Sequence, residues 1–208
     1  KDATSEERQI DEINTGVYAF DAAFLREGLG ALTTENAQGE FYLTDLIGMA
    51  AEKISEEESL PTLQIPIEEA LGVNDRVQLA EAGQLLRAQI LHYWMENGVS
   101  MVDPATTYVD ASVHMEQDVT LGAHVSLRGR TTIASHTHID AGCVLSDTQV
   151  GKNSKIHCYS ICENAHVGND VSVGPFARLR PDAKLESHSK VGNFVEIKKA
   201  VLINVWAT

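Results

Sequence analysis

Cysteine, aromatic residues and positive charge are all scarce in this chain of 208 residues. Three cysteines are too few for the disulfide framework of a small secreted domain. Sixteen Lys and Arg against thirty Asp and Glu leave a formal net charge of −14, which excludes a nucleic-acid binder that relies on phosphate neutralisation. No apolar run approaches the ~20 residues that span a bilayer. We therefore expect a cytoplasmic globular protein that binds neither nucleic acid nor membrane.

The charge is unevenly distributed along the chain. Residues 1–100 hold 19 acidic and 6 basic side chains, whereas residues 101–208 hold 11 and 10. This break near residue 100 indicates two units of different design. Within residues 178–199 the sign reverses, with six basic against three acidic side chains. That stretch suits a small anionic ligand, although a solvated face that balances the acidic half would look the same.

The first hundred residues predict helices mixed with short strands. Residues 13–20 have the pattern of a buried strand, and residues 60–67 that of an edge strand. Helix signals begin at the capping residue Asp21, and a second apolar helix is expected over residues 43–51. A long helix is predicted over residues 76–96, ended by Asn97 and Gly98. These elements are too few to close a doubly wound sheet, so they indicate the remnant of an α/β domain.

The second half has a six-residue period. Stepping by six from Val109, with five-residue steps before Val150 and Ile161, meets Val, Ile, Leu or Met at sixteen consecutive positions, ending at Ile197. Neither a helix nor an ordinary strand generates this spacing. It is typical of a parallel β-helix, in which three hexapeptides form one coil of a triangular prism. The sixteen aliphatic residues, here called rungs, are predicted to fill about five coils.

Two cations follow rungs at equivalent positions. Arg180 comes directly after Leu179, and Lys198 directly after Ile197. Their spacing of eighteen residues equals three hexapeptides, so the two side chains are expected on adjacent coils, one above the other. Two such cations repel each other unless an anion lies between them. The spacing therefore predicts a phosphate site, with plain surface charge as the alternative.

Three stretches together resemble one bacterial enzyme family. They are residues 12–16 with 36–45 (EINTG and NAQGEFYLTD), residues 72–76 (GVNDR), and residues 173–181 with 191–200 (VGPFARLRP and VGNFVEIKKA). In composition and order they resemble the bifunctional N-acetylglucosamine-1-phosphate uridylyltransferase / glucosamine-1-phosphate acetyltransferase. The resemblance implies the C-terminal part of a Rossmann-like uridylyltransferase domain over residues 1–74 and a linker helix over 75–102. A left-handed, trimerising β-helix would follow over 103–202, with an unmatched tail over 203–208.

The resemblance also implies a function. Enzymes of this family make UDP-N-acetylglucosamine for peptidoglycan and lipopolysaccharide from acetyl-CoA, UTP and sugar phosphates, with Mg²⁺. By resemblance, Asn14 contacts the sugar nucleotide, Asn74 helps to hold the Mg²⁺, and Arg180 and Lys198 bind the sugar phosphate. The family's nucleotide loop and its catalytic histidine have no counterpart here. We therefore expect an internal fragment that lacks both ends, holds no catalytic residue and is inactive alone.

Other interpretations of the same residues stay open. The chain could be an inert trimerising module, or a sugar-nucleotide pyrophosphorylase of the adenylyl type. Asn74 could simply cap the long helix, and Asn14, if buried, could be satisfied by neighbouring backbone. Cys158 and Cys162 lack a second pair for a zinc cage. A zinc hydratase site of the same prism is not expected, because the spacing does not fit and no carboxylate–histidine pairing is evident; the histidines considered are His124, His136, His138 and His157.

Overall fold

The computed structural model describes residues 9, 14–36, 38–55, 59–203 and 206–207. The chain divides into two units, Lys1–Leu79 and Ala80–Thr208. Each unit is described by itself below. No helix in the described part of the chain is long and apolar enough to cross a membrane.

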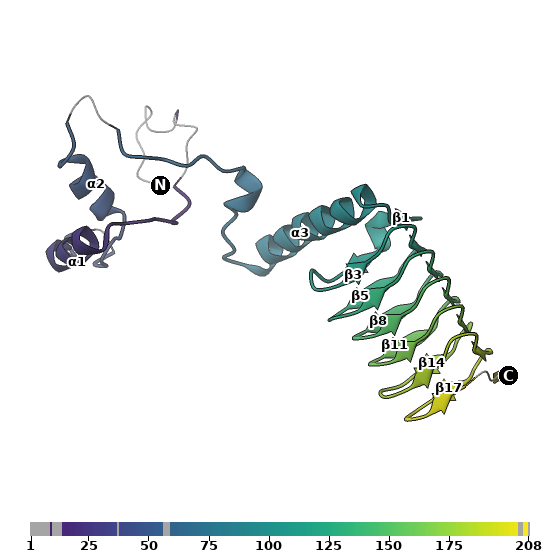
Figure 1. Ribbon diagram of the computed structural model, residues 1–208. Helices are drawn as coiled ribbons and strands as arrows, with labels where there is room; N and C mark the ends of the chain where they lie inside the picture. The colour runs from purple at the N-terminus through teal and green to yellow at the C-terminus, as the bar shows by residue number, and fades with distance from the viewer. Residues whose placement is uncertain (1–8, 10–13, 37, 56–58, 204–205, 208) are drawn as a thin grey trace. The chain divides into compact units, whose positions relative to one another are not determined.

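The described residues of the first unit form short helices joined by irregular segments (Figure 1). It contains α1 (Ala22–Ala31), α2 (Asp45–Ala51) and the 3₁₀ helix η2 (Ile67–Glu69). Asp21 caps α1 as predicted, since its carboxylate accepts hydrogen bonds from the backbone N–H groups of Ala23 and Phe24 at 2.9 and 3.0 Å. Leu46 of α2 is fully buried against Gly28 of α1. The two helices predicted before residue 52 are therefore confirmed.

The two strands expected in this unit are not formed. Residue 13 lies outside the described residues, and residues 14–20 and 60–67 adopt no strand. Val17, which was expected in a buried strand, is 82% exposed. A strand needs a neighbour with which to exchange backbone hydrogen bonds, and the described residues of this unit offer none. In this unit the apolar pattern alone therefore did not predict a buried strand, because no partner strand is present among the described residues.

The long helix α3 (Arg76–Glu96) has the predicted bounds. Its cap is Asp75, whose carboxylate accepts from the Gln78 backbone N–H at 2.8 Å. Gln78 completes a capping-box arrangement, because its side-chain oxygen accepts from the Asn74 backbone N–H at 2.7 Å. The alternative in which Asn74 itself caps the helix is therefore wrong. At the other end Gly98 adopts φ +87, the left-handed conformation typical of a helix stop.

Substituting Gly83 in the middle of α3 tests how strongly local propensity acts. A Cβ added there meets no atom within 4 Å, and the residue is exposed. We expect Gly83→Ala to raise the free energy of unfolding by about 1 kcal/mol, because alanine removes the entropic cost of a helical glycine. Denaturant unfolding followed by circular dichroism measures the change. A loss of stability would contradict the open surroundings described for this position.

The second unit coils into three parallel sheets, which form the sides of a prism (Figure 1). Sheet A contains β1 (Ser100–Met101), β4 (Thr120–Leu121), β7 (His138–Ile139), β10 (Lys155–Ile156), β13 (Ser172–Val173), β16 (Lys190–Val191) and β19 (Trp206–Ala207). Sheet B contains β2 (Tyr108–Val109), β5 (Ser126–Arg128), β8 (Val144–Ser146), β11 (Ile161–Glu163), β14 (Arg178–Leu179) and β17 (Glu196–Ile197). Sheet C contains β3 (His114–Met115), β6 (Thr132–Ile133), β9 (Gln149–Val150), β12 (His166–Val167), β15 (Lys184–Leu185) and β18 (Val201–Leu202). A short 3₁₀ helix, η3 (Pro104–Thr106), precedes β2.

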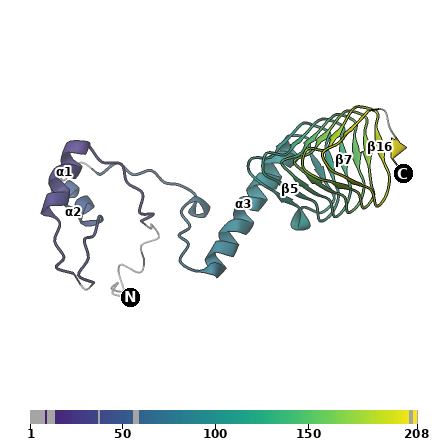
Figure 2. The same ribbon diagram turned by 90° about the horizontal axis from the view of Figure 1, so that it is seen from below.

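The rungs fill the interior of this prism. Fifteen of the sixteen predicted rungs are buried, and in-register pairs such as Leu127↔Leu145 stack them from coil to coil. Leu91 and Trp94 of α3 join the same cluster, so α3 covers the N-terminal end of the core. Figure 2 shows the coils stacked in a column, with the C-terminus at the end opposite α3. The predicted parallel β-helix with hexapeptide repeats is confirmed.

One rung was misassigned. Ile161 is 39% exposed, whereas Cys162 is fully buried and pairs in register with Leu145 and Leu179. The five-residue step therefore falls between Cys162 and Val167. Isoleucine is the more apolar residue, but a thiol is a small hydrophobe that packs equally well inside the prism. Strand pairing also continues past residue 202, where β19 pairs with β16.

The corners of the prism are of two types, one with a left-handed backbone conformation and one with close contact between coils. At corners of the first type the backbone is left-handed: thirteen non-glycine residues of the described chain adopt positive φ, among them Asp118 and His136. Asn, Asp and His tolerate this conformation better than most residues. At corners of the second type the backbones of successive coils come close, and a Cβ on Gly122 would lie 2.6 Å from the Ala141 nitrogen. This contact explains the small residues that follow several rungs.

Candidate functional site

Arg180 and Lys198 lie at equivalent positions on neighbouring coils. Leu179 of β14 pairs with Ile197 of β17, and the Arg180 backbone N–H donates to the Ile197 carbonyl at 2.8 Å. Each cation is the first residue after a strand of sheet B, directly following the rung of that strand. The eighteen-residue spacing thus places the two cations next to each other along the prism.

A carboxylate already faces one of these cations. Glu196 precedes the rung Ile197, and its Oε1 lies 3.3 Å from Arg180 Nη1. Both side chains are partly exposed, so water and salt screen this ion pair. Arg178 makes a similar pair with Glu163 at 3.1 Å. The positive charge of residues 178–199 is therefore partly neutralised locally, and any anion at Arg180 would have to compete with Glu196 for the guanidinium.

Asn14 and Asn74 both belong to the first unit. Asn14 is exposed and forms a local turn, in which its side-chain oxygen accepts from the Gly16 backbone N–H at 2.9 Å and its amide nitrogen donates to the Tyr18 hydroxyl. It is therefore not a polar residue buried within a strand. Asn74 is also exposed, and the carboxylate of Asp75 performs the capping beside it.

The described residues do not build a complete metal site. They contain no group of three or more His, Cys, Asp and Glu side chains that could hold an ion. Mg²⁺ takes about six oxygen ligands in near-octahedral geometry, and Asn74 offers a single amide oxygen. Asn74 can therefore supply at most one of the ion's ligands.

The three cysteines are free thiols in different surroundings. Cys162 is a core rung, and burial raises its pKa. Burial likewise raises the pKa of the Cys143 thiol to about 12. Both thiols are held in the unreactive protonated form at neutral pH.

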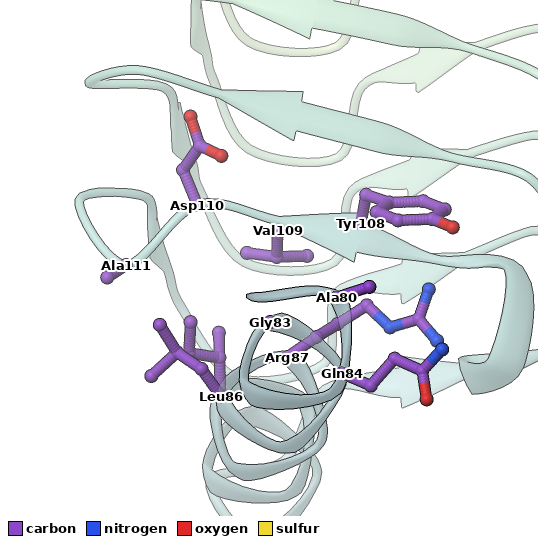
Figure 3. Close-up of a pocket in the computed structure, with 10 residues that line it drawn as sticks. Ala80, Gly83, Gln84, Leu86, Arg87, Tyr108, Val109, Asp110 and Ala111 are labelled. Atoms are coloured by element: carbon purple, nitrogen blue, oxygen red, sulfur yellow. The ribbon is translucent and has the colours of Figure 1, made fainter. Parts of the chain in front are cut away.

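A shallow groove lies between α3 and the first coil (Figure 3). Its volume is about 470 Å³, and the Arg87 guanidinium lies over the Tyr108 ring at 4.6 Å from the centroid. Its other lining residues include Leu86 from the helix and Asp110 from the coil. None of the four predicted site residues lines it. Sequence patterns could not predict this groove, because it depends on how α3 crosses the coil.

A second hollow, of about 480 Å³, lies beside the C-terminal end of α3. Trp94 packs edge-on against His114 there, with ring centroids 5.6 Å apart. The Ser135 backbone N–H donates to Glu116 at 2.8 Å and lowers the pKa of that carboxyl. Lys152 also lines the hollow, so its lining carries both negative and positive charge and does not favour a ligand of one charge.

Several histidines pair with carboxylates of the neighbouring coil, contrary to the sequence expectation. His157 Nδ1 lies 3.2 Å from Asp140 Oδ2, and its Nε2 lies 3.1 Å from Ser172 Oγ. Longer pairs join His136 to Asp118 and His188 to Asp170, at 3.7 and 3.9 Å. The signal was present in the sequence, because each pair is separated by 17 or 18 residues, the length of one coil.

Comparison with known proteins agrees with this architecture. Residues 164–199 match the family model described as bacterial transferase hexapeptide (six repeats). The chain is 42% identical over 205 residues to the bifunctional protein GlmU of Pelobacter propionicus, which covers 97% of this chain and 44% of that protein. Over its length this chain is GlmU-like. The GlmU of Listeria monocytogenes serovar 1/2a gives the same identity over 202 residues, again with 97% and 44% coverage.

The GlmU-like chain spans less than half the length of these relatives. The resemblance predicted from the three sequence stretches is confirmed. Among solved structures, a hexapeptide transferase family protein from Anaplasma phagocytophilum is 21% identical and aligns over 50% of this chain and 68% of its own, with a TM-score of 0.33.

Proposed function

We propose that this GlmU-like chain provides the sugar-phosphate-binding side of a glucosamine-1-phosphate acetyltransferase. The supporting observation is the position of Arg180 and Lys198 on adjacent coils, within residues 164–199, which match the hexapeptide transferase model. A phosphate between the two cations relieves their repulsion and accepts charge-assisted hydrogen bonds from both. Glu196 would hold the Arg180 guanidinium in place until the phosphate replaces it.

The intact enzyme would perform two reactions. Acetyl-CoA would acetylate glucosamine-1-phosphate, and uridylyl transfer from UTP would then give UDP-N-acetylglucosamine for peptidoglycan and lipopolysaccharide. Asn14 would contact the sugar nucleotide. Asn74 would supply one oxygen to a Mg²⁺ ion whose other ligands come from the nucleotide and other residues, and the ion would neutralise phosphate charge.

We further propose that the isolated chain performs neither reaction. Acyl transfer to an amine needs a positioned general base, and the resemblance implies that the family's catalytic histidine has no counterpart among the eight histidines of this sequence. The 208 residues would then bind the sugar phosphate and assemble in the cytoplasm as a trimer, without turnover.

Exposed aromatic rings support the trimer. Tyr159, Phe176 and Phe194 occupy one corner on three successive coils, and all three rings are exposed. Neighbouring rings stack with centroids 5.5 and 5.3 Å apart. A contiguous apolar strip on a protein surface is typical of an association site. Side-by-side packing of prisms would cover this strip.

Three measurements on the purified chain test the proposal together. Light scattering after size exclusion should give the mass of a trimer, and calorimetry should detect binding of glucosamine-1-phosphate. Pyrophosphate release from UTP and CoA release from acetyl-CoA should both stay at background. Release of either product would contradict the proposed inactivity. A trimer that binds no sugar phosphate would instead support the inert module, which the Arg180–Glu196 ion pair favours.

A further inference from the structure

Three polar side chains form a chain of hydrogen bonds across successive coils on sheet A. Asp140 follows β7, His157 follows β10 and Ser172 begins β13. The rungs beside them, Ile139, Ile156 and Val173, pair in register, which aligns the three coils. The bonds run from Asp140 Oδ2 to His157 Nδ1 at 3.2 Å and from His157 Nε2 to Ser172 Oγ at 3.1 Å.

This order of groups is the one that activates a serine. A carboxylate that accepts the Nδ1–H fixes the imidazole tautomer, which leaves the Nε2 lone pair for the proton of the serine hydroxyl. The imidazole and carboxylate side chains are only 35% and 36% exposed, so they are partly withdrawn from water. Both bonds lie within the 2.6–3.2 Å reach expected of a nucleophile, its base and the group that orients the base.

The sheet holds all three residues in place. Asp140 and His157 donate their backbone N–H groups to the next coil at 2.8 Å, and Ser172 donates at 3.1 Å. A site built on strands is more precisely positioned than one on loops, so the relay needs little reorganisation before it reacts. The fold does not require an Asp–His pair at this place, because the positions equivalent to Asp140 and His157 on other coils of sheet A hold valine (Val102) or glycine (Gly122, Gly174 and Gly192).

Two lysines flank the serine. Lys155 of β10 and Lys190 of β16 pair in register with Ser172, one on each side, and both side chains lie on the outer face of sheet A. Parallel strands are about 4.8 Å apart, so each lysine side chain can reach a group bound at Ser172. Their charge favours an anionic substrate and stabilises negative charge that develops on a carbonyl oxygen.

We propose that Ser172 is a nucleophile that accepts an acyl group from an activated carboxylic ester bearing a negative charge. Ser172 Oγ attacks the carbonyl carbon while its proton moves to His157 Nε2. The bond to the leaving alcohol then breaks, and the alcohol departs with that proton. Water attacks the acyl-serine in the same way, His157 returns the proton to Oγ, and the carboxylic acid leaves. The site lies on sheet A and is independent of the sugar-phosphate function proposed above for the Arg180 and Lys198 positions.

Covalent labelling of the full chain tests the nucleophile. A fluorophosphonate probe should add one label, which peptide mapping places on Ser172. Mono-4-nitrophenyl succinate should release nitrophenolate faster than the uncharged 4-nitrophenyl acetate does. His157→Gln keeps a hydrogen-bonding side chain but removes the base, so it should slow both labelling and release by about 100-fold or more.

Ser100→Ala is the matched control. Ser100 occupies the same position in the same sheet, on β1, but β1 is the first strand and has no preceding coil to supply a histidine. Ser172→Ala should abolish the label while Ser100→Ala retains it, with both variants melting at similar temperatures. An unlabelled wild-type chain, or equal labelling of wild type, Ser172→Ala and His157→Gln, would overturn the proposal. Variants that lower the melting temperature without changing the label would make the relay a structural tie, which also overturns it.

Discussion

Truncating the rung Leu145 to alanine should lower the free energy of unfolding by about 2–5 kcal/mol. Leu145 is fully buried at the centre of the prism, and it pairs in register with Leu127 below and Cys162 above. The parallel ladder prevents the backbones of these coils from closing on the vacated space. The loss therefore combines the transfer free energy of the missing carbon atoms with the cost of a cavity.

The neighbouring Ile161 provides the control. It lies in the same sheet but faces outward, so Ile161→Ala should cost under about 1 kcal/mol. Denaturant unfolding of both variants, at a fixed protein concentration because association also stabilises the fold, measures the difference. If Ile161 were the buried rung, as the sequence predicted, Leu145→Ala and Ile161→Ala would lower the free energy of unfolding by similar amounts. Equal losses would therefore contradict the register in which Cys162 points inward.

The core of the prism could be predicted because each rung repeats the same local requirement. Hexapeptide spacing depends only on one apolar residue per strand, and fifteen of the sixteen rungs satisfy it. The pattern failed only at Ile161 and Cys162, where the more apolar isoleucine was taken as the rung although the register of the strands places the cysteine inside. Helix α3 was predictable for a similar reason, since Asp75 is a local start signal and Gly98 a local stop signal.

Features that join distant parts of the chain were harder to predict. The strand expected at residues 13–20 needed a partner that the sequence could not place. The adjacency of Arg180 and Lys198 followed from a spacing of eighteen residues, but the ion pair with Glu196 did not, because it depends on side-chain direction across the coils. The relay of Asp140, His157 and Ser172 was missed because both coils that join these residues are seventeen residues long and only multiples of eighteen were expected to stack.

Removing Arg180 or Lys198 should weaken the binding of glucosamine-1-phosphate by about 10–100-fold each. A hydrogen bond to a charged group contributes about 1.5–3 kcal/mol, and about 1.4 kcal/mol corresponds to a tenfold change in affinity. We expect less than additive loss in the double variant, because the two cations share one anion. Isothermal titration calorimetry of Arg180→Ala, Lys198→Ala and the double variant measures these changes.

Glu196 gives this prediction its sharpest control. Glu196→Gln removes the carboxylate that competes for Arg180, so the phosphate should bind more tightly than in the unmodified chain, and by a larger factor at low salt. Lys184→Ala removes a cation on sheet C that is paired with Glu186, and it should leave the affinity unchanged. Equal weakening by Lys184→Ala and Lys198→Ala would mean that the phosphate responds to overall charge. Tighter binding by Glu196→Gln, weaker binding by Lys198→Ala and unchanged binding by Lys184→Ala would together place the anion between the two coils that carry Arg180 and Lys198, because a response to overall charge would weaken binding in Lys184→Ala as well.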